Sequence, residues 1–236
     1  MLYVDGASNV YGDDLEDRNL AWPFLLSQKL DIPINNVAQR GKSNQHMLFD
    51  LINNCITNKP KFVVLAWQPV IRKMVVRREN NCVIDMSVNS IIEDYDKDRD
   101  FKKYQELTYK YWSNFLYDAW NFLQIIICAQ NFLKTHNIPY LMFNDTDQTD
   151  ILHLLTISSA DVKIKNRILD AFDCLDDSEI KKIEYSISSL YHNIDHDRYY
   201  DFSWYTHKLV NFYTHPNAEQ HRIIANFVEN LVAKHL

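Results

Sequence analysis

Met1-Leu2-Tyr3-Val4 is a short apolar run that leads into Asp5-Gly6-Ala7-Ser8, a pattern typical of a buried strand followed by a tight turn. Further along the chain, Phe62-Val63-Val64-Leu65-Ala66 is the clearest buried strand, because it is uncharged and rich in β-branched residues. Strands of this kind are covered on both faces, as in a parallel sheet that lies between layers of helices. The two runs therefore favour an α/β fold.

Between and beyond these strands, apolar residues recur at helical spacing. We expect helices and strands over the ranges 21–30 (helix), 36–38 (strand), 45–55 (helix), 62–66 (strand), 101–135 (helix), 140–143 (strand) and 222–236 (helix). This alternation predicts a three-layer α/β/α sandwich with a mainly parallel, flavodoxin-like sheet.

Two charged, aromatic-rich stretches, about 74–100 and 146–210, interrupt the alternation. No linker rich in Pro, Gly or Ser separates them from the rest. We therefore interpret them as helical or irregular insertions over the active face of a single domain that spans 1–236.

The composition excludes several classes of protein. With 31 acidic and 25 basic side chains the formal net charge is −6, whereas nucleic-acid-binding proteins usually present a basic face. No run is apolar enough to cross a membrane, and no signal peptide is recognisable. The four cysteines form no CxxC pair, so we expect reduced thiols, no metal site and a cytoplasmic protein. Cys128 lies in an apolar run and is expected to behave as a small hydrophobe.

Ser8 follows the first predicted strand directly, in a turn that contains Gly6. Open α/β folds bind ligands at the carboxyl ends of their strands, so Ser8 is a candidate nucleophile and Asn9 a candidate substrate contact. A serine hydroxyl needs an adjacent base to react. The competing interpretation is an ordinary loop in which Ser8 or Asn9 caps a helix.

Gly41-Lys42-Ser43-Asn44 follows the second predicted strand. A glycine here could turn its N–H toward a developing oxyanion, with Asn44 in support. Alternatively, the segment is a loop in which Ser43 or Asn44 caps the next helix.

Trp67-Gln68-Pro69-Val70-Ile71-Arg72 follows the strongest strand. The Gln68 amide could donate to an oxyanion, and Arg72 could bind a substrate carboxylate or phosphate beside Trp67. In the competing interpretation, Trp67 belongs to the core and Arg72 forms a surface ion pair.

His215 precedes the last predicted helix, whose start is indicated by Pro216 and Glu219. In that loop the imidazole is free to point over the edge of the sheet, which makes His215 a candidate general base. A lone loop histidine usually has no catalytic role. His221, one turn into the helix, is interpreted as structural.

These four segments, in this order, resemble the sequence blocks of the SGNH (GDSL-like) hydrolases. The resemblance implies that Ser8 is the nucleophile, that Gly41 and Gln68 contribute to the oxyanion hole, and that His215 is the base. Small SGNH-like proteins of tailed bacteriophages and large DNA viruses are the most similar, because they share a start that matches here Gly6, Ser8, Gly12, Asp13, Asp14 and Leu15.

The chain departs from the family pattern at three positions. Ala7 replaces the aspartate of the first block, and Gln68 stands where an asparagine is expected. Phe212 occupies the position of the triad acid, three residues before His215. Candidates for a replacement acid, chosen only for their closeness in sequence, are Asp201, Asp195 and Asp197.

The resemblance implies an esterase or O-deacetylase that acts on a small-molecule or glycan ester without a cofactor. The altered acid and amide favour a second interpretation, a degenerate protein of the same fold that binds a ligand or protein partner. Acyl transfer in place of hydrolysis is the third. We expect no nucleic-acid or membrane partner; a homo-oligomer would suit the aromatics of 146–210, and a viral protein could occupy the host cytoplasm or the virion.

Overall fold

The structure is a computed structural model, and it describes residues 1–68, 70, 72–76, 83–86, 103–108, 115–145, 177–200 and 215–236. Five strands form one parallel sheet in the order β2-β1-β3-β6-β7. Their bounds are β1 Leu2–Asp5, β2 Ile34–Asn36, β3 Phe62–Trp67, β6 Tyr140–Asn144 and β7 Tyr199–Tyr200. This order and direction confirm the predicted α/β fold with a flavodoxin-like parallel sheet.

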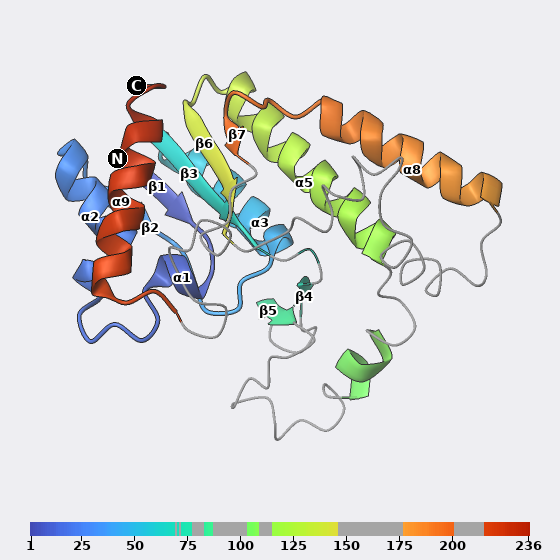
Figure 1. Cartoon of the computed structure of the whole chain (residues 1–236), viewed down its shortest axis with the longest axis horizontal. Helices are drawn as coiled ribbons and strands as arrows, with labels where there is room; N and C mark the ends of the chain where they lie inside the picture. Colours follow the sequence, from blue (N-terminus) through green and yellow to red (C-terminus); the bar gives the residue numbers. More distant parts are fainter. Residues whose placement is uncertain are drawn as a thin grey trace.

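Helices cover both faces of the sheet (Figure 1). The described helices are α1 Ser8–Tyr11, the 3-10 helix η1 Arg18–Leu20, α2 Trp22–Leu30, α3 Asn44–Thr57, α5 Phe115–Thr135, α8 Asp177–His192 and α9 Ala218–Val232. Helices α2 and α9 pack together on one face, whereas α3, α5 and α8 pack in sequence on the other.

The central strand β3 supplies residues to both layers, because successive side chains of a strand point to opposite faces. Val63 and Leu65 join the core beneath α3 and α5, and Phe62 and Val64 join the core beneath α2 and α9. All six residues of β3 are buried. The sheet therefore has no solvent-facing side along this strand, as its uncharged sequence predicts.

Several element boundaries differ from those predicted. The closing helix begins at Ala218, because Asn217 and Gln220 form a capping box at its start. Strand β2 covers Ile34–Asn36 rather than 36–38. Two of its three residues are asparagines, which are poor strand formers, so the strand becomes evident only through its pairing with β1. Within the predicted helix over 101–135, the structure describes helical residues at 103–108 and helix α5, and 109–114 lie outside the described residues.

The described parts of the two predicted insertions differ in character. The first contributes strands β4 Lys73–Val76 and β5 Val83–Met86, which pair antiparallel in a small second sheet. The second contains α8 and also β7, which is the last strand of the main sheet. That part of 146–210 thus belongs to the central architecture, and a strand of two residues is too short to show the alternation that identifies strands in a sequence.

Cys55 is a buried free thiol and Cys128 an exposed one, while Cys82 and Cys174 lie outside the described residues. The expectation that Cys128 behaves as a buried hydrophobe is wrong, because α5 turns this position to solvent. Across the described helices, none combines the length and apolar character that crossing a membrane requires.

His221 is a fully buried residue at the contact between α9 and α2. Its Nδ1 accepts a hydrogen bond from the backbone N–H of Trp22 at 3.2 Å, so the proton of the neutral ring lies on Nε2. Burial, with a smaller contribution from the charge of His215, lowers the pKa of His221 from 6.5 to about 4. Protonation would place a second N–H against that of Trp22.

We expect His221 to destabilise the fold in acid. Since its folded pKa lies below the unfolded value, its contribution to stability is complete above about pH 6.5 and is lost as the pH falls toward 4, up to about 3 kcal/mol. Replacement by asparagine, whose Oδ1 can accept the Trp22 N–H, should remove this part of the pH dependence of the free energy of unfolding. Urea titrations at pH 7, 5.5 and 4 measure the difference in the free energy of unfolding between the wild type and the His221→Asn protein.

The difference between the two proteins is the informative quantity, because Asp5 acts in the opposite direction. Burial raises the pKa of Asp5 from 3.8 to about 6, so its contribution is lost as the pH rises through 6. This background is common to both proteins. An unchanged pH dependence in the His221→Asn protein would contradict the prediction.

Candidate active site

The turn after β1 brings Ser8 to the carboxyl edge of the sheet. A Cβ at Gly6 would lie 2.3 Å from Cγ2 of Val10 and 3.3 Å from Cβ of Ala66, so only glycine allows the turn to pack this closely on β3. Ser8 is the first residue of α1 and is half-buried. Among the described residues its hydroxyl has no hydrogen-bond partner, and its side chain caps no helix.

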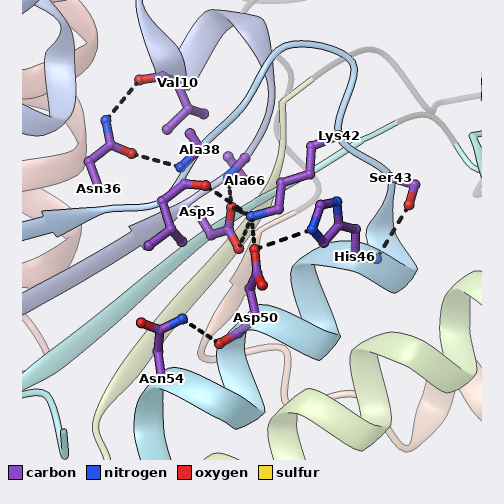
Figure 2. A network of polar contacts seen from close by, with 12 residues as sticks. Asp5, Val10, Asn36, Ala38, Lys42, Ser43, His46, Asp50, Asn54 and Ala66 are labelled. Carbon is purple, nitrogen blue, oxygen red and sulfur yellow. Dashed lines mark hydrogen bonds and ion pairs between the residues drawn. The ribbon is translucent and has the colours of Figure 1, made fainter. Parts of the chain in front are cut away.

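Beneath this turn, Asp5 and Lys42 form an ion pair in which both side chains are fully buried (Figure 2). Nζ of Lys42 lies 2.8 and 3.0 Å from the carboxylate oxygens of Asp5 and donates to the carbonyl of Val37 at 2.9 Å. Asp5 also accepts from the Gly6 N–H at 2.8 Å and from the hydroxyl of Tyr3 at 3.2 Å. The pair joins the turn that carries Ser8 to the loop that carries Gly41.

The buried network extends into α3 and the small sheet. Lys42 also contacts Asp50 at 2.6 Å, and Asp50 lies 3.6 Å from Nε2 of His46. Nδ1 of His46 is 2.7 Å from Asp85 of β5, whose other oxygen accepts the Ser43 N–H at 2.9 Å. One chain of polar contacts therefore holds β1, the start of α3 and β5 together.

Gly41 lies in the loop beside the Ser8 turn, where Gln39 N–H donates to the carbonyl of Gly6 at 3.3 Å. Its φ of +69° is in the left-handed region, which favours glycine. A Cβ added there would meet nothing within 4 Å, so the loop faces open space. Ser43 caps α3 by accepting the His46 N–H at 3.3 Å, which agrees with the capping interpretation of this segment.

Asn44 fixes the end of β3 to the start of α3. Its Nδ2 donates to the carbonyl of Gln68 and its Oδ1 accepts the Gln68 N–H, each at 2.8 Å. Asn44 is 3% exposed, so this pair of bonds leaves the side chain little access to a substrate. It supports the site by joining two loops of the carboxyl edge.

The side chain of Gln68 is buried and engaged in internal contacts. Its Nε2 donates to the carbonyl of Ala66 at 2.9 Å and to Asp145 at 3.0 Å, and its Oε1 accepts from Arg72 at 3.0 Å. An amide nitrogen has two hydrogens, and both are used here. Gln68 could donate to an oxyanion only by releasing one of these partners.

The remaining candidates of this segment and of the first turn are placed as follows. Trp67 is fully buried in the core, with its ring edge-on to Phe122 at 6.4 Å, so it does not line the site. Arg72 is half-buried over the loop and also reaches the carbonyl of Lys42 at 3.4 Å. Asn9 is 3% exposed, and its Oδ1 has no hydrogen-bond partner within the described ranges.

His215 lies in the loop before α9, and its side chain is 34% exposed. Its Nδ1 is 2.8 Å from Oδ2 of Asp14, and its Nε2 is 3.9 Å from Oδ2 of Asp13. No hydrogen bond joins it to Ser8 in the described part of the chain. The structure therefore brings His215 to the turn that follows α1. That turn is close to Ser8 in sequence, but His215 and Ser8 are not hydrogen-bonded to each other.

The three acids chosen by closeness in sequence do not contact His215 in the described residues. Asp195 accepts from Lys134 at 2.7 Å and from the hydroxyl of Tyr140 at 3.2 Å, Asp197 is exposed, and Asp201 lies outside the described residues. No group of three or more His, Cys, Asp or Glu side chains in the described ranges is arranged to hold a metal ion.

Sequence reasoning missed the roles of Asp5, Lys42 and Asp14. Asp5 carried a usable signal, since a charged residue at the end of a fully buried strand needs a partner of opposite charge. Lys42 lies in a segment whose proposed roles in the site belong to Gly41 and Asn44. The contact between Asp14 and His215 spans 201 positions, and no local pattern predicts it.

Comparison with known proteins gives similarity in fold only. No family model and no curated protein matches the chain. Among solved structures, the esterase EstA of Pseudoalteromonas sp. in a form inhibited by monoethylphosphonate has a TM-score of 0.52 and 10% identity, covering 99% of this chain and 96% of that one. The structure of TesA has a TM-score of 0.51 and 11% identity, covering 98% and 97%. A putative lipolytic protein of the G-D-S-L family from Desulfitobacterium hafniense has a TM-score of 0.49 and 12% identity, covering 98% of each chain.

The chain therefore shares the α/β fold of EstA and TesA over nearly its whole length and theirs. At these identities the likeness does not extend to residue roles or substrates. The closeness to phage and viral proteins stays a prediction.

Proposed function

We propose that the protein is a serine hydrolase that cleaves an ester bond, with Ser8 as nucleophile and His215 as general base. The observation that carries the proposal is the hydroxyl of Ser8, which stands unbonded in the described residues at the carboxyl edge of an esterase-type fold, beside a loop that is open at Gly41. Open α/β sheets place their ligands at this edge.

In the proposed reaction, Oγ of Ser8 attacks the ester carbonyl carbon while Nε2 of His215 takes the hydroxyl proton. His215 then gives that proton to the departing alkoxide, and an alcohol leaves an acyl-serine behind. Water, deprotonated by His215, then attacks the acyl-serine; as the bond to Oγ breaks, His215 returns the proton to Oγ, which releases the carboxylic acid and restores the Ser8 hydroxyl. In ligand-free enzymes catalytic hydrogen bonds are often long, so His215 approaches Ser8 when substrate binds.

The oxyanion of each tetrahedral intermediate needs donors that are already oriented. The backbone N–H groups of Ser8 and Gly41 are the proposed donors, because two contacts hold their loops side by side: the ion pair of Asp5 with Lys42, and the hydrogen bond from the Gln39 N–H to the Gly6 carbonyl. Arg72 is the proposed contact for a carboxylate or phosphate on the substrate. The proposed substrates are small-molecule or glycan esters, and the proposed setting is the cytoplasm.

The proposal predicts turnover of short-chain p-nitrophenyl esters and covalent labelling of the purified protein by a fluorophosphonate probe. Because the probe reacts with an activated serine and mimics the tetrahedral intermediate, peptide mass spectrometry should find the phosphonyl group on Ser8. Heat-denatured protein is the control, since it keeps every serine but loses the site. The proposal would be refuted if the native protein showed no ester turnover and the probe left Ser8 unlabelled.

A second function, binding of a ligand or partner without catalysis, is favoured by two observations. Ser8 and His215 share no hydrogen bond among the described residues, and both hydrogens of the Gln68 amide are used internally. A non-catalytic protein would leave Ser8 unlabelled by the probe. The labelling experiment therefore decides between the two functions.

A further inference from the structure

We infer that Asp14 is the positioning residue for His215, so that the acid of the site comes from the turn after the nucleophile rather than from the segment before the histidine. This inference rests on the proposed function for its catalytic meaning. The family pattern would place the acid three residues before His215, where this chain has Phe212.

The geometry of the pair determines where the imidazole carries its proton. Nδ1 of His215 lies 2.8 Å from Oδ2 of Asp14. An ionised carboxylate can only accept hydrogen bonds, so Nδ1 must be the donor. In the neutral ring this leaves the lone pair on Nε2, which is the atom that must take the proton of Ser8.

The turn that carries Asp14 is anchored to the nucleophile. The N–H groups of Gly12 and Asp13 both donate to the carbonyl of Ser8, at 3.0 and 3.1 Å. Asp14 itself has a φ of +64°, an uncommon conformation for a residue with a side chain. The carboxylate is thereby presented at a fixed position relative to Ser8.

Asp13, the other acid near His215, forms an ion pair with Arg40 instead. Its side chain is 7% exposed and pairs with Arg40 through Oδ1, while its Oδ2 lies 3.9 Å from Nε2, beyond hydrogen-bond reach. Asp13 therefore holds the turn to the loop before Gly41, and Asp14 alone of the two acids bonds the ring.

The alternative explanation is that Asp14 and His215 form an ordinary surface contact between two loops. Asp14 is 71% exposed, and ion pairs this exposed contribute little to stability. The two explanations differ in what the carboxylate controls. A positioning residue sets the tautomer of His215 and the rate of the reaction, whereas a surface contact affects neither.

The experiment replaces Asp14 with asparagine, which tolerates a positive φ, and with glycine, which adopts it freely and removes the side chain. Glu16→Gln is the matched control, because it removes an exposed carboxylate of the same loop that, in the described structure, makes no hydrogen bond or ion pair with His215. We expect kcat/KM for a p-nitrophenyl ester to fall roughly 100-fold or more in both Asp14 proteins, through kcat rather than KM, with the melting temperature nearly unchanged. The control should keep the wild-type rate.

A second measurement is independent of activity. Long-range 15N-edited NMR of the imidazole rings, with the signals of His215 identified by their loss in a His215→Gln protein, reports which nitrogen is protonated. We expect Nδ1–H in the wild type and a mixture or reversal of tautomers in the Asp14→Gly protein.

The outcomes separate the inference from the proposed function. If the wild type turns over esters but both Asp14 proteins keep its rate and its tautomer, the inference is overturned and the proposed function stands. If the wild type has no activity, the NMR result alone decides: a changed tautomer supports positioning by Asp14, and an unchanged one overturns it.

Discussion

Replacing Ser8 with alanine is expected to lower kcat/KM for a short-chain aryl ester by at least roughly 10³-fold and to leave the melting temperature within a degree or two of the wild type. Activity falls because alanine has no oxygen to form the acyl intermediate. Stability is kept because, in the described residues, the hydroxyl makes no hydrogen bond that the fold would lose. Steady-state kinetics and thermal unfolding of the same preparation measure both effects.

Ser189→Ala is the matched control, because this serine is exposed on α8, away from the carboxyl edge. A His215→Ala protein and the double variant add a test of cooperation. Residues that act as a unit have strongly non-additive effects, so the double variant should be about as slow as Ser8→Ala alone. Equal activity of Ser8→Ala and wild type would assign any turnover to another residue.

Replacing Lys42 with methionine is expected to lower the free energy of unfolding by about 3–5 kcal/mol, the cost of leaving a buried charge without its partner. Nζ of Lys42 contacts both Asp5 and Asp50, at 2.8 and 2.6 Å. Methionine keeps the length and apolar stem of the side chain, so packing changes little. Urea denaturation at pH 7 measures the loss, and failure to fold at 37 °C would be its extreme form.

Lys29→Met is the matched control for a lysine ion pair. Lys29 and Glu229 are separated by 2.8 Å, as in the buried pair, but about a third of each side chain is exposed. Exposed pairs of this kind contribute about 0–1 kcal/mol. If Lys42→Met lowered the free energy of unfolding no more than Lys29→Met does, the polar network would be irrelevant to stability. If adding Asp5→Asn to Lys42→Met restored part of the lost free energy, the unpaired carboxylate would be identified as the cause.

The sequence predicted those parts of the fold that depend on local patterns. Uncharged β-branched runs identified β3, and helical spacing identified α2, α3 and α9. Strand β2, with two asparagines, and β7, with two residues, carry no such pattern and exist through pairing with their neighbours in the sheet. Tertiary pairing overrides propensity at such positions.

The same division applies to the site. Ser8, Gly41 and His215 could be selected because each follows a strand or precedes a helix in a recognisable order. What each side chain touches could not be derived, because contacts such as that of Asp14 with His215 join distant parts of the chain. Gln68 shows the difference: the order of the segments predicts its position, whereas its bond to Asp145 arises from the pairing of β3 with β6.

The shortness of the outer strands has a consequence for behaviour at high concentration. In the described part of the chain, the edge strands of the sheet are β2, with three residues, and β7, with two, so each edge strand offers few unpaired backbone groups. Long, flat borders recruit strands from other molecules and start aggregates. Short edge strands on both sides protect the apolar central strands from intermolecular strand addition. The asparagines of β2 also make that edge strand a poor template for amyloid-like growth.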